Sequence, residues 1–145
     1  MPQAVRAMKA AALCLLFLAG CAASATPPEP IRISRGWKGG EARFVGELRL
    51  KKGCIVAGAG KSWATPLFNP EATFGKDHRA IREGSRPAIA FGQKFAAGAA
   101  ILRDDGRGWS MADVEQFYGV KIPVACPRRD VVRLHDLVAI EENPQ

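Results

Sequence analysis

Few side chains in this sequence suit acid–base or metal chemistry. The two histidines, His78 and His135, lie far apart, and His78 has a carboxylate, Asp77, directly beside it. Neighbouring residues in a strand point to opposite faces, which disfavours Asp77 and His78 as one acid–base or metal pair. A zinc site needs three or four protein ligands, and no such set stands out. No Gly-x-Ser-x-Gly nucleophile motif occurs either. We therefore predict no enzyme activity, no catalytic residue, no metal and no cofactor.

A glycine-rich segment, Gly58-Ala59-Gly60-Lys61-Ser62, raises the question of a phosphate-binding loop. That motif requires a glycine five positions before the Gly-Lys pair, and the residue there is Ile55. The segment also lies between two apolar runs with no helix pattern after it. We predict a turn between two strands.

Basic residues form two groups near the middle and the end of the chain. The anion-binding candidates are Lys76, Arg79, Arg82, Arg86, Arg128, Arg129 and Arg133. If both groups met on one face, they would bind a polyanion, a phosphate-bearing glycolipid or an acidic protein partner. The competing interpretation is a solvated rim, with the nearby aromatic residues Trp63, Phe68 and Phe74 in the core.

The N-terminus has the three-part pattern of a secretory signal peptide. Residues 1–9 carry Arg6 and Lys9 without an acid, and residues 10–20 are uncharged and leucine-rich. This apolar run is too short to span a bilayer, which takes about 20 residues. Removing it leaves 19 of the 21 basic residues against 14 acidic ones, a net charge of +5. Such a charge favours anionic surfaces, and for an exported chain we expect no nucleic-acid partner.

The four residues that close this segment, Leu18-Ala19-Gly20-Cys21, resemble the lipobox of bacterial lipoproteins. The resemblance implies cleavage before Cys21 and acylation of that cysteine, which anchors the protein in a membrane. Ala22, rather than Asp, after the cysteine points to the outer membrane, facing the periplasm of a two-membrane organism. Cleavage after Ala25, at the Ala-Ser-Ala site, is the alternative and would release a soluble periplasmic protein.

Cys54 and Cys126 are the cysteines left in the mature chain once Cys14 is removed and Cys21 is acylated. Export places them in an oxidising compartment, so we predict a disulfide between them. A bridge closing a loop of about 70 residues contributes roughly 4 kcal/mol by the chain-entropy argument. A reactive thiol or a metal ligand is the alternative role.

The sequence pattern of the mature domain is typical of a β protein. Alternation of apolar and polar residues or short apolar runs predict strands at 42–50, 54–57, 63–68, 88–91, 94–102 and 131–140. One helix is expected between Ser110, which can cap it with Asp113, and Gly119, which can end it. Its expected apolar stripe is Val114, Phe117 and Tyr118.

These elements predict an all-β fold, a small five- to six-stranded OB-like barrel with one short helix before the last strand. The chain divides into a signal peptide at 1–20, a lipidated cysteine and proline-rich tether at 21–30, a single barrel domain at 31–142, and a tail at 143–145. The mature part is loosely similar to small uncharacterised bacterial lipoprotein domains. The shared features are Gly53-Cys54, Pro70-Glu71, a glycine-rich middle hairpin and Cys126-Pro127. The resemblance covers about three quarters of the mature chain and implies no known activity.

Together these features predict a membrane-anchored envelope lipoprotein. We expect it to be a non-enzymatic binding module for an anionic envelope component or an envelope protein. A structural or assembly accessory of an envelope complex is the alternative.

Overall fold

The structure is a computed structural model, and it describes residues 28–35, 42–104 and 106–142. The predicted signal peptide, Cys21 and most of the predicted tether therefore lie outside the described residues. The fold is strand-rich with one α-helix, which confirms the all-β prediction. No helix in the described ranges is long and apolar enough to cross a membrane.

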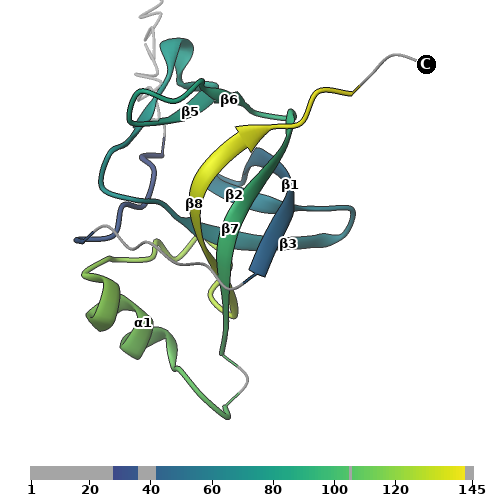
Figure 1. Cartoon of the computed structure of the whole chain (residues 1–145). Coiled ribbons are helices and arrows are strands. Elements are labelled where there is room, and N and C mark those ends of the chain that lie inside the picture. Colours follow the sequence, from purple (N-terminus) through teal and green to yellow (C-terminus); the bar gives the residue numbers. More distant parts are fainter. Residues whose placement is uncertain (1–27, 36–41, 105, 143–145) are drawn as a thin grey trace, which may run out of the picture.

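Five strands form the main body of the molecule (Figure 1). They are β1 (Ala42–Lys51), β2 (Cys54–Ala59), β3 (Ser62–Leu67), β7 (Lys94–Arg103) and β8 (Asp130–Ala139). They pair in the closed barrel order β1-β2-β3-β8-β7, so that the last strand in the order returns to the first. All neighbours are antiparallel except β3 and β8, which are parallel.

A second, three-stranded sheet lies at one end of the barrel (Figure 1). It contains β4 (Ala72–Phe74), β5 (Ala80–Glu83) and β6 (Ile89–Ala90), with the short 3-10 helix η1 (Lys76–His78) between β4 and β5. The apolar residues Ala72, Ile81 and Ile89 close the barrel core from this end. Of these strands, the sequence predicted only the segment around β6.

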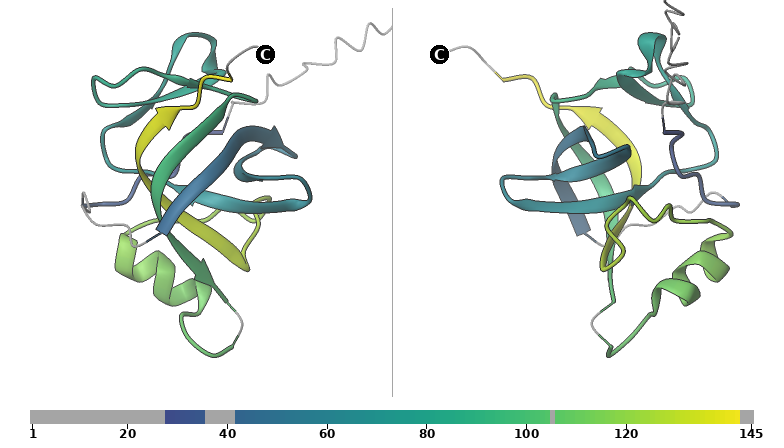
Figure 2. Two further views of the ribbon diagram at one scale, coloured as in Figure 1. Left: turned by 45° about the vertical axis from the view of Figure 1, so that its right-hand side comes forward. Right: turned by 180° about the vertical axis from the view of Figure 1, so that it is seen from behind.

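The single helix, α1 (Met111–Tyr118), lies at the other end of the barrel (Figure 2). Ser110 caps it in a capping box with Asp113, and Gly119 ends it in the left-handed conformation, as predicted. The predicted apolar stripe is partly wrong, because Phe117 is 54% exposed and contacts Trp109 edge to face. The buried stripe is Met111, Val114 and Tyr118.

A disulfide joins Cys54 at the start of β2 to Cys126 in the loop before β8, with Cα atoms 5.2 Å apart. Both cysteines are buried in a second core between the barrel and α1. The predicted bridge is therefore present, and it fastens the helical end of the molecule to the barrel.

The alternation predicted for β1 is confirmed up to Leu48, which is fully buried in the barrel. Leu50, placed on the same face by the period of two, is 52% exposed instead. At Leu50 the strand has reached the end of the barrel. Its side chain, although on the same face of the strand as Leu48, therefore borders an open pocket.

Candidate anion-binding site

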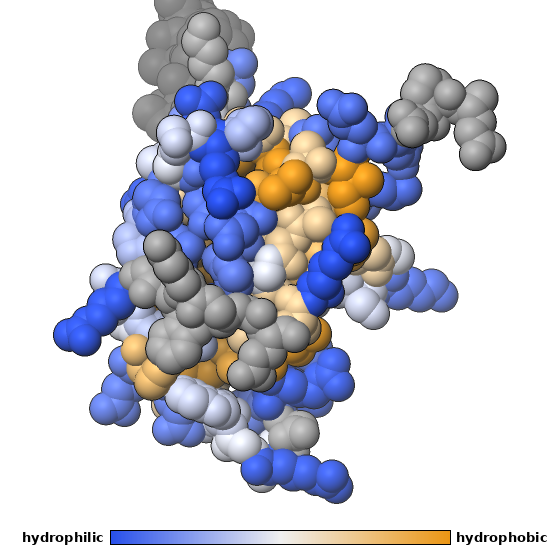
Figure 3. Space-filling model, in the orientation of Figure 1, coloured by the Kyte–Doolittle hydropathy of each residue, from blue (hydrophilic) through white to orange (hydrophobic). Residues whose placement is uncertain are grey.

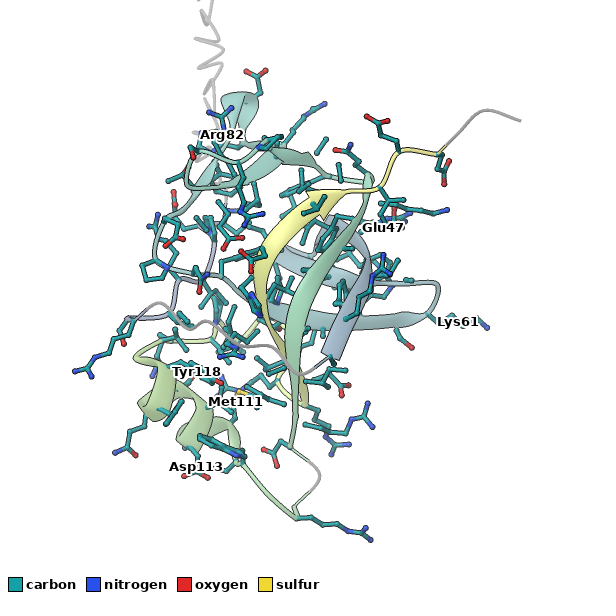
Figure 4. The ribbon with its side chains drawn as sticks, in the orientation of Figure 1. Glu47, Lys61, Arg82, Met111, Asp113 and Tyr118 are labelled. Atoms are coloured by element: carbon teal, nitrogen blue, oxygen red, sulfur yellow. A yellow bond between two sulfur atoms is a disulfide. The ribbon has the colours of Figure 1, made fainter. Side chains whose placement is uncertain are left out.

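The structure separates the two predicted basic groups. Arg82 lies on β5 in the small sheet, at the top of Figure 4, whereas Arg128 and Arg129 precede the first residue of β8. Arg86 pairs with Asp136 near the far end of β8, roughly 20 Å along the strand from Arg129. The two groups therefore do not meet on one face, and a single site made from both is wrong.

Several of the predicted basic residues are also occupied within the protein. Arg133 is only 3% exposed, because its side chain on β8 points inward. The prediction that Arg133 belongs to an exposed anion-binding group is therefore wrong. Arg86 donates to Asp136 at 2.7 Å. Arg128 donates to the Ile122 carbonyl and lies 3.6 Å from a Glu115 carboxylate oxygen. Lys76 begins η1, and its side chain is outside the description.

Arg79 instead borders an open pocket of about 480 Å³ at the small-sheet end of the barrel. We call it the barrel-end pocket, and its lining residues are Arg49, Leu50, His78, Arg79, Phe91 and Gly92. They come from the end of β1, from the last residue of η1 and the residue that follows it, and from the turn between β6 and β7. Three of the six lining residues are basic, and none of the described lining residues is acidic.

Arg49 is held in place on the outer face of β1. Its guanidinium is 2.6 Å from a Glu47 carboxylate oxygen and 5.3 Å from the centre of the Trp63 ring. The ammonium of Lys51 lies 3.9 Å from the same ring centre. Both cations form cation–π contacts with Trp63, which brings the positive charges of Arg49 and Lys51 close together beside the pocket.

Gly58 explains how the Trp63 ring reaches β1. Glu47, Gly58 and Trp63 are register partners on three adjacent strands, so they lie in one row. A Cβ on Gly58 would be 2.0 Å from the Ser62 carbonyl oxygen, so no larger residue fits the close approach of β2 and β3. Lys61 is at the tip of this hairpin in Figure 4. The segment predicted to be a turn rather than a phosphate loop is that hairpin turn.

The other wall of the pocket is shaped by unusual backbone conformations. Asp77 and His78 both have positive φ, 66° and 53°, in the left-handed region that costs a non-glycine residue about 1 kcal/mol or more. The His78 ring packs edge-on against Phe74 at 4.8 Å, and the Arg79 carbonyl accepts a hydrogen bond from the Phe91 amide. These contacts hold His78 and Arg79 beside β1.

Charge at the pocket is only partly compensated. Glu47 is the acidic neighbour, and Arg49 already binds it. No ion pair or side-chain hydrogen bond joins Arg79 to another described residue. An anion entering the pocket therefore meets a guanidinium with open donors, and guanidinium donors suit carboxylate and phosphate oxygens.

Sequence reasoning found Arg79 and singled out His78, but it missed Arg49, Leu50 and Phe91. Arg49 was part of a predicted strand, and nothing in its neighbourhood marked it as a site residue. These residues meet Arg79 only because the barrel closes, which brings the end of β1 next to the segment before β5. The one available signal was the pair Arg49 and Lys51 at the end of a strand that also contains Leu50.

A buried polar cluster lies elsewhere, where β8 bulges against β7. The carboxylate of Glu83, which is 5% exposed, accepts hydrogen bonds from the Asn69 side chain and from the backbone amides of Asp136 and Leu137. His135 is also buried, with Nδ1 3.0 Å from an Asp136 carboxylate oxygen. This cluster fastens the small sheet to the bulge.

Hydrogen bonds at the surface shift the pKa values of Asp113, Lys94 and Glu142. The carboxyl pKa of Asp113 is lowered because it accepts hydrogen bonds from the Ser110 hydroxyl and amide. The pKa of Lys94 is raised and that of Glu142 lowered by the hydrogen bond and opposite charges they share. Within the described ranges, no group of three or more His, Cys, Asp or Glu side chains is placed to hold a metal ion.

An apolar row crosses the face seen in Figure 3, over β1, β7 and β8. Val45, Ala96 and Val138 are register partners on the three strands. Val45 is 50% exposed and Val138 54% exposed. This row is distinct from the barrel-end pocket, and Arg43 and Asp136 lie beside it.

Comparison with known proteins finds no matching family model, no matching curated protein and no matching solved structure. The site is therefore interpreted from its own geometry.

Proposed function

We propose that this chain is a lipid-anchored envelope lipoprotein whose OB-like barrel binds an anionic component of the envelope. The observation that carries the proposal is the barrel-end pocket, where Arg49, His78 and Arg79 converge without an acidic side chain among the described lining residues. The lipobox-like Leu18-Ala19-Gly20-Cys21 supports the anchor. The proposed role is binding, without catalysis, in the outer membrane facing the periplasm.

The strand order supports the OB-like assignment. OB barrels have five strands in a Greek-key arrangement and bind oligosaccharides and oligonucleotides through strand faces and loops. Here the order β1-β2-β3-β8-β7 and the parallel β3–β8 pair fit such a barrel. The small sheet occupies the connection between the third and fourth barrel strands, and α1 the next connection.

The anchor is tested by the intact mass of the protein from the membrane fraction, compared with the Cys21→Ser variant. We expect a chain that begins at Cys21 and carries acyl groups, lost in the variant. A soluble, unacylated chain that begins at Thr26 would overturn the anchor and favour the soluble periplasmic alternative.

Anion binding is tested with residues 21–145 expressed without the signal segment and carrying Cys21→Ser, with immobilised polyphosphate as the probe. We expect retention that weakens as salt rises, because exposed charges are screened beyond a Debye length of about 8 Å at physiological ionic strength. Arg79→Glu should abolish most of the retention. Arg129→Glu makes the same change in net charge at the other end of β8 and should change it little. Equal losses in both variants would contradict a defined site.

A second candidate, an accessory that acts by contact within an envelope complex, is favoured by the apolar row of Val45, Ala96 and Val138. A pull-down from solubilised envelopes that recovers one stoichiometric protein at all salt concentrations would support it. The variant Val138→Glu should then lose the partner, whereas Arg79→Glu should keep it.

A further inference from the structure

We infer that the barrel-end pocket binds the phosphate of an anionic lipid in the membrane to which the chain is anchored, with Leu50 against the apolar part of that lipid. This inference rests on the proposed function: it names the ligand class of the same site. Three features of the described residues carry it: the donors, the exposed apolar wall and the position of the N-terminal segment.

The donors suit a phosphate group. Arg79 offers guanidinium N–H groups that no described residue uses, and Arg49 and His78 face the same pocket. A phosphate has several acceptor oxygens, so it can bind donors from more than one wall at once. Arg49 stays bound to Glu47 and contributes positive charge from the opposite side.

The apolar wall distinguishes a lipid from a soluble polyanion. Leu50 is 52% exposed beside two arginines, and Phe91 is half-buried next to it. A polyphosphate or acidic glycan would leave this surface in water. A lipid has apolar chains directly below its phosphate and would cover it, at roughly 25 cal/mol for each Å² removed from water. Gly92 leaves the pocket open, since a Cβ there would meet no atom within 4 Å.

The N-terminal segment keeps the domain near the proposed anchor. Arg32 donates to the Ala72 carbonyl at the start of β4, and Pro28 lines a pocket with Cys126 at the other side of the segment. Figures 1 and 2 show the purple N-terminal segment starting below the small sheet and running towards the α1 end of the molecule. Cys21 precedes Pro28 by a few residues, a reach of at most roughly 25 Å. The proposed anchor therefore keeps the domain close to the membrane surface, where the pocket can reach the headgroups.

The inference is tested by sedimentation of residues 21–145, expressed without the signal segment and carrying Cys21→Ser. The vesicles contain phosphatidylcholine alone or an equal mixture with phosphatidylglycerol. We expect binding to the mixed vesicles and little to the neutral ones. Arg79→Glu should weaken it about tenfold, since each cation at an anionic surface contributes about 1 kcal/mol and reversal also adds repulsion. Leu50→Ser should weaken vesicle binding several-fold and leave retention on polyphosphate unchanged.

Two matched variants control for general effects. Arg129→Glu changes net charge equally, and Ile101→Ser removes an exposed aliphatic side chain, 64% exposed, from outside the pocket. Both should bind mixed vesicles like the parent chain. All substituted residues are exposed, and equal circular dichroism spectra and unfolding midpoints check that each variant is folded.

The outcomes separate the inference from the proposed function. Loss of vesicle binding in Arg79→Glu and Leu50→Ser, but not in the controls, supports the lipid. Retention on polyphosphate that depends on Arg79, with vesicle binding absent or indifferent to Leu50, overturns the lipid and leaves anion binding intact. Independence of both assays from Arg79 overturns the inference and the anion site together.

Discussion

Gly98 and His135 show how one residue without a side chain makes room for a buried ring. They are register partners on β7 and β8, and a Cβ on Gly98 would lie 2.3 Å from both Cε1 and Nε2 of the imidazole. We expect Gly98→Ala to lower the free energy of unfolding by about 1–3 kcal/mol, because the ring must leave its position.

Urea unfolding measures this cost, and Gly108→Ala is the matched control. Gly108 has no positive φ, and a Cβ there would meet nothing within 4 Å. Its substitution should be nearly neutral. If Gly98→Ala were equally neutral, the close contact with His135 would not constrain the fold.

Ser110 and Asp113 give a second prediction at this scale, on pH. The Ser110 donors lower the carboxyl pKa of Asp113 from 3.8, so the folded state favours the ionised form. This contribution is fully present above pH 3.8 and is lost as the pH falls through the lowered pKa. We expect Asp113→Asn to be less stable than the parent at neutral pH, and the difference to shrink in acid.

The measurement is the urea midpoint of both chains from neutral pH to below pH 3. Ser110→Ala, which removes the cap itself, should cost about 1 kcal/mol at neutral pH. A difference between parent and Asp113→Asn that stays constant across the whole range would contradict the capping role of the carboxylate.

The elements of this fold differ in how well the sequence predicts them. The five long strands and α1 carry their own signals, namely alternation, short apolar runs, turn glycines and a capping box. In the small sheet only the segment around β6 carries such a signal, because β4, β5 and β6 have two to four residues each and no period is measurable over such lengths. The barrel-end pocket is hard to predict from the sequence for the same reason. Two of its walls come from the small-sheet region and one from β1, and only tertiary packing brings them together.

Glu83 holds the small sheet to the barrel, which gives a prediction for the element as a whole. Its carboxylate accepts the Asp136 and Leu137 amides, which the bulge in β8 frees from pairing with β7. Glu83→Ala leaves these buried donors without an acceptor and should cost about 2–3 kcal/mol. Hydrogen exchange of the two amides should quicken.

Glu71→Ala controls for removing a carboxylate near the same sheet, since Glu71 is exposed. It should leave stability and exchange unchanged. Slow exchange at Asp136 and Leu137 in Glu83→Ala would show that another group satisfies the bulge.

At the scale of the whole molecule, the disulfide links the barrel to the helical end. Cys54 and Cys126 are separated by 72 residues, and both are buried in the core beneath α1. We expect the double variant Cys54→Ala, Cys126→Ala to lose roughly 4 kcal/mol of stability by the chain-entropy argument. Urea unfolding of parent and variant, each with and without a reducing agent, measures this loss.

Reductant should destabilise the parent and leave the double variant unchanged. Cys21→Ser, outside the described residues, should respond to reductant like the parent. A parent chain insensitive to reductant under unfolding conditions would contradict a stabilising bridge.

The parallel pairing of β3 with β8 has a kinetic consequence. Thr65 pairs with Val131 across most of the domain, so the barrel closes only by bringing distant parts of the chain together. Folds rich in such long-range pairs fold slowly. Until the C-terminal strand arrives, β3 and β7 each present an open edge, and open edges template aggregation. Nearly the whole domain must therefore be available before its barrel closes, and the unfolded chain needs protection from self-association until then.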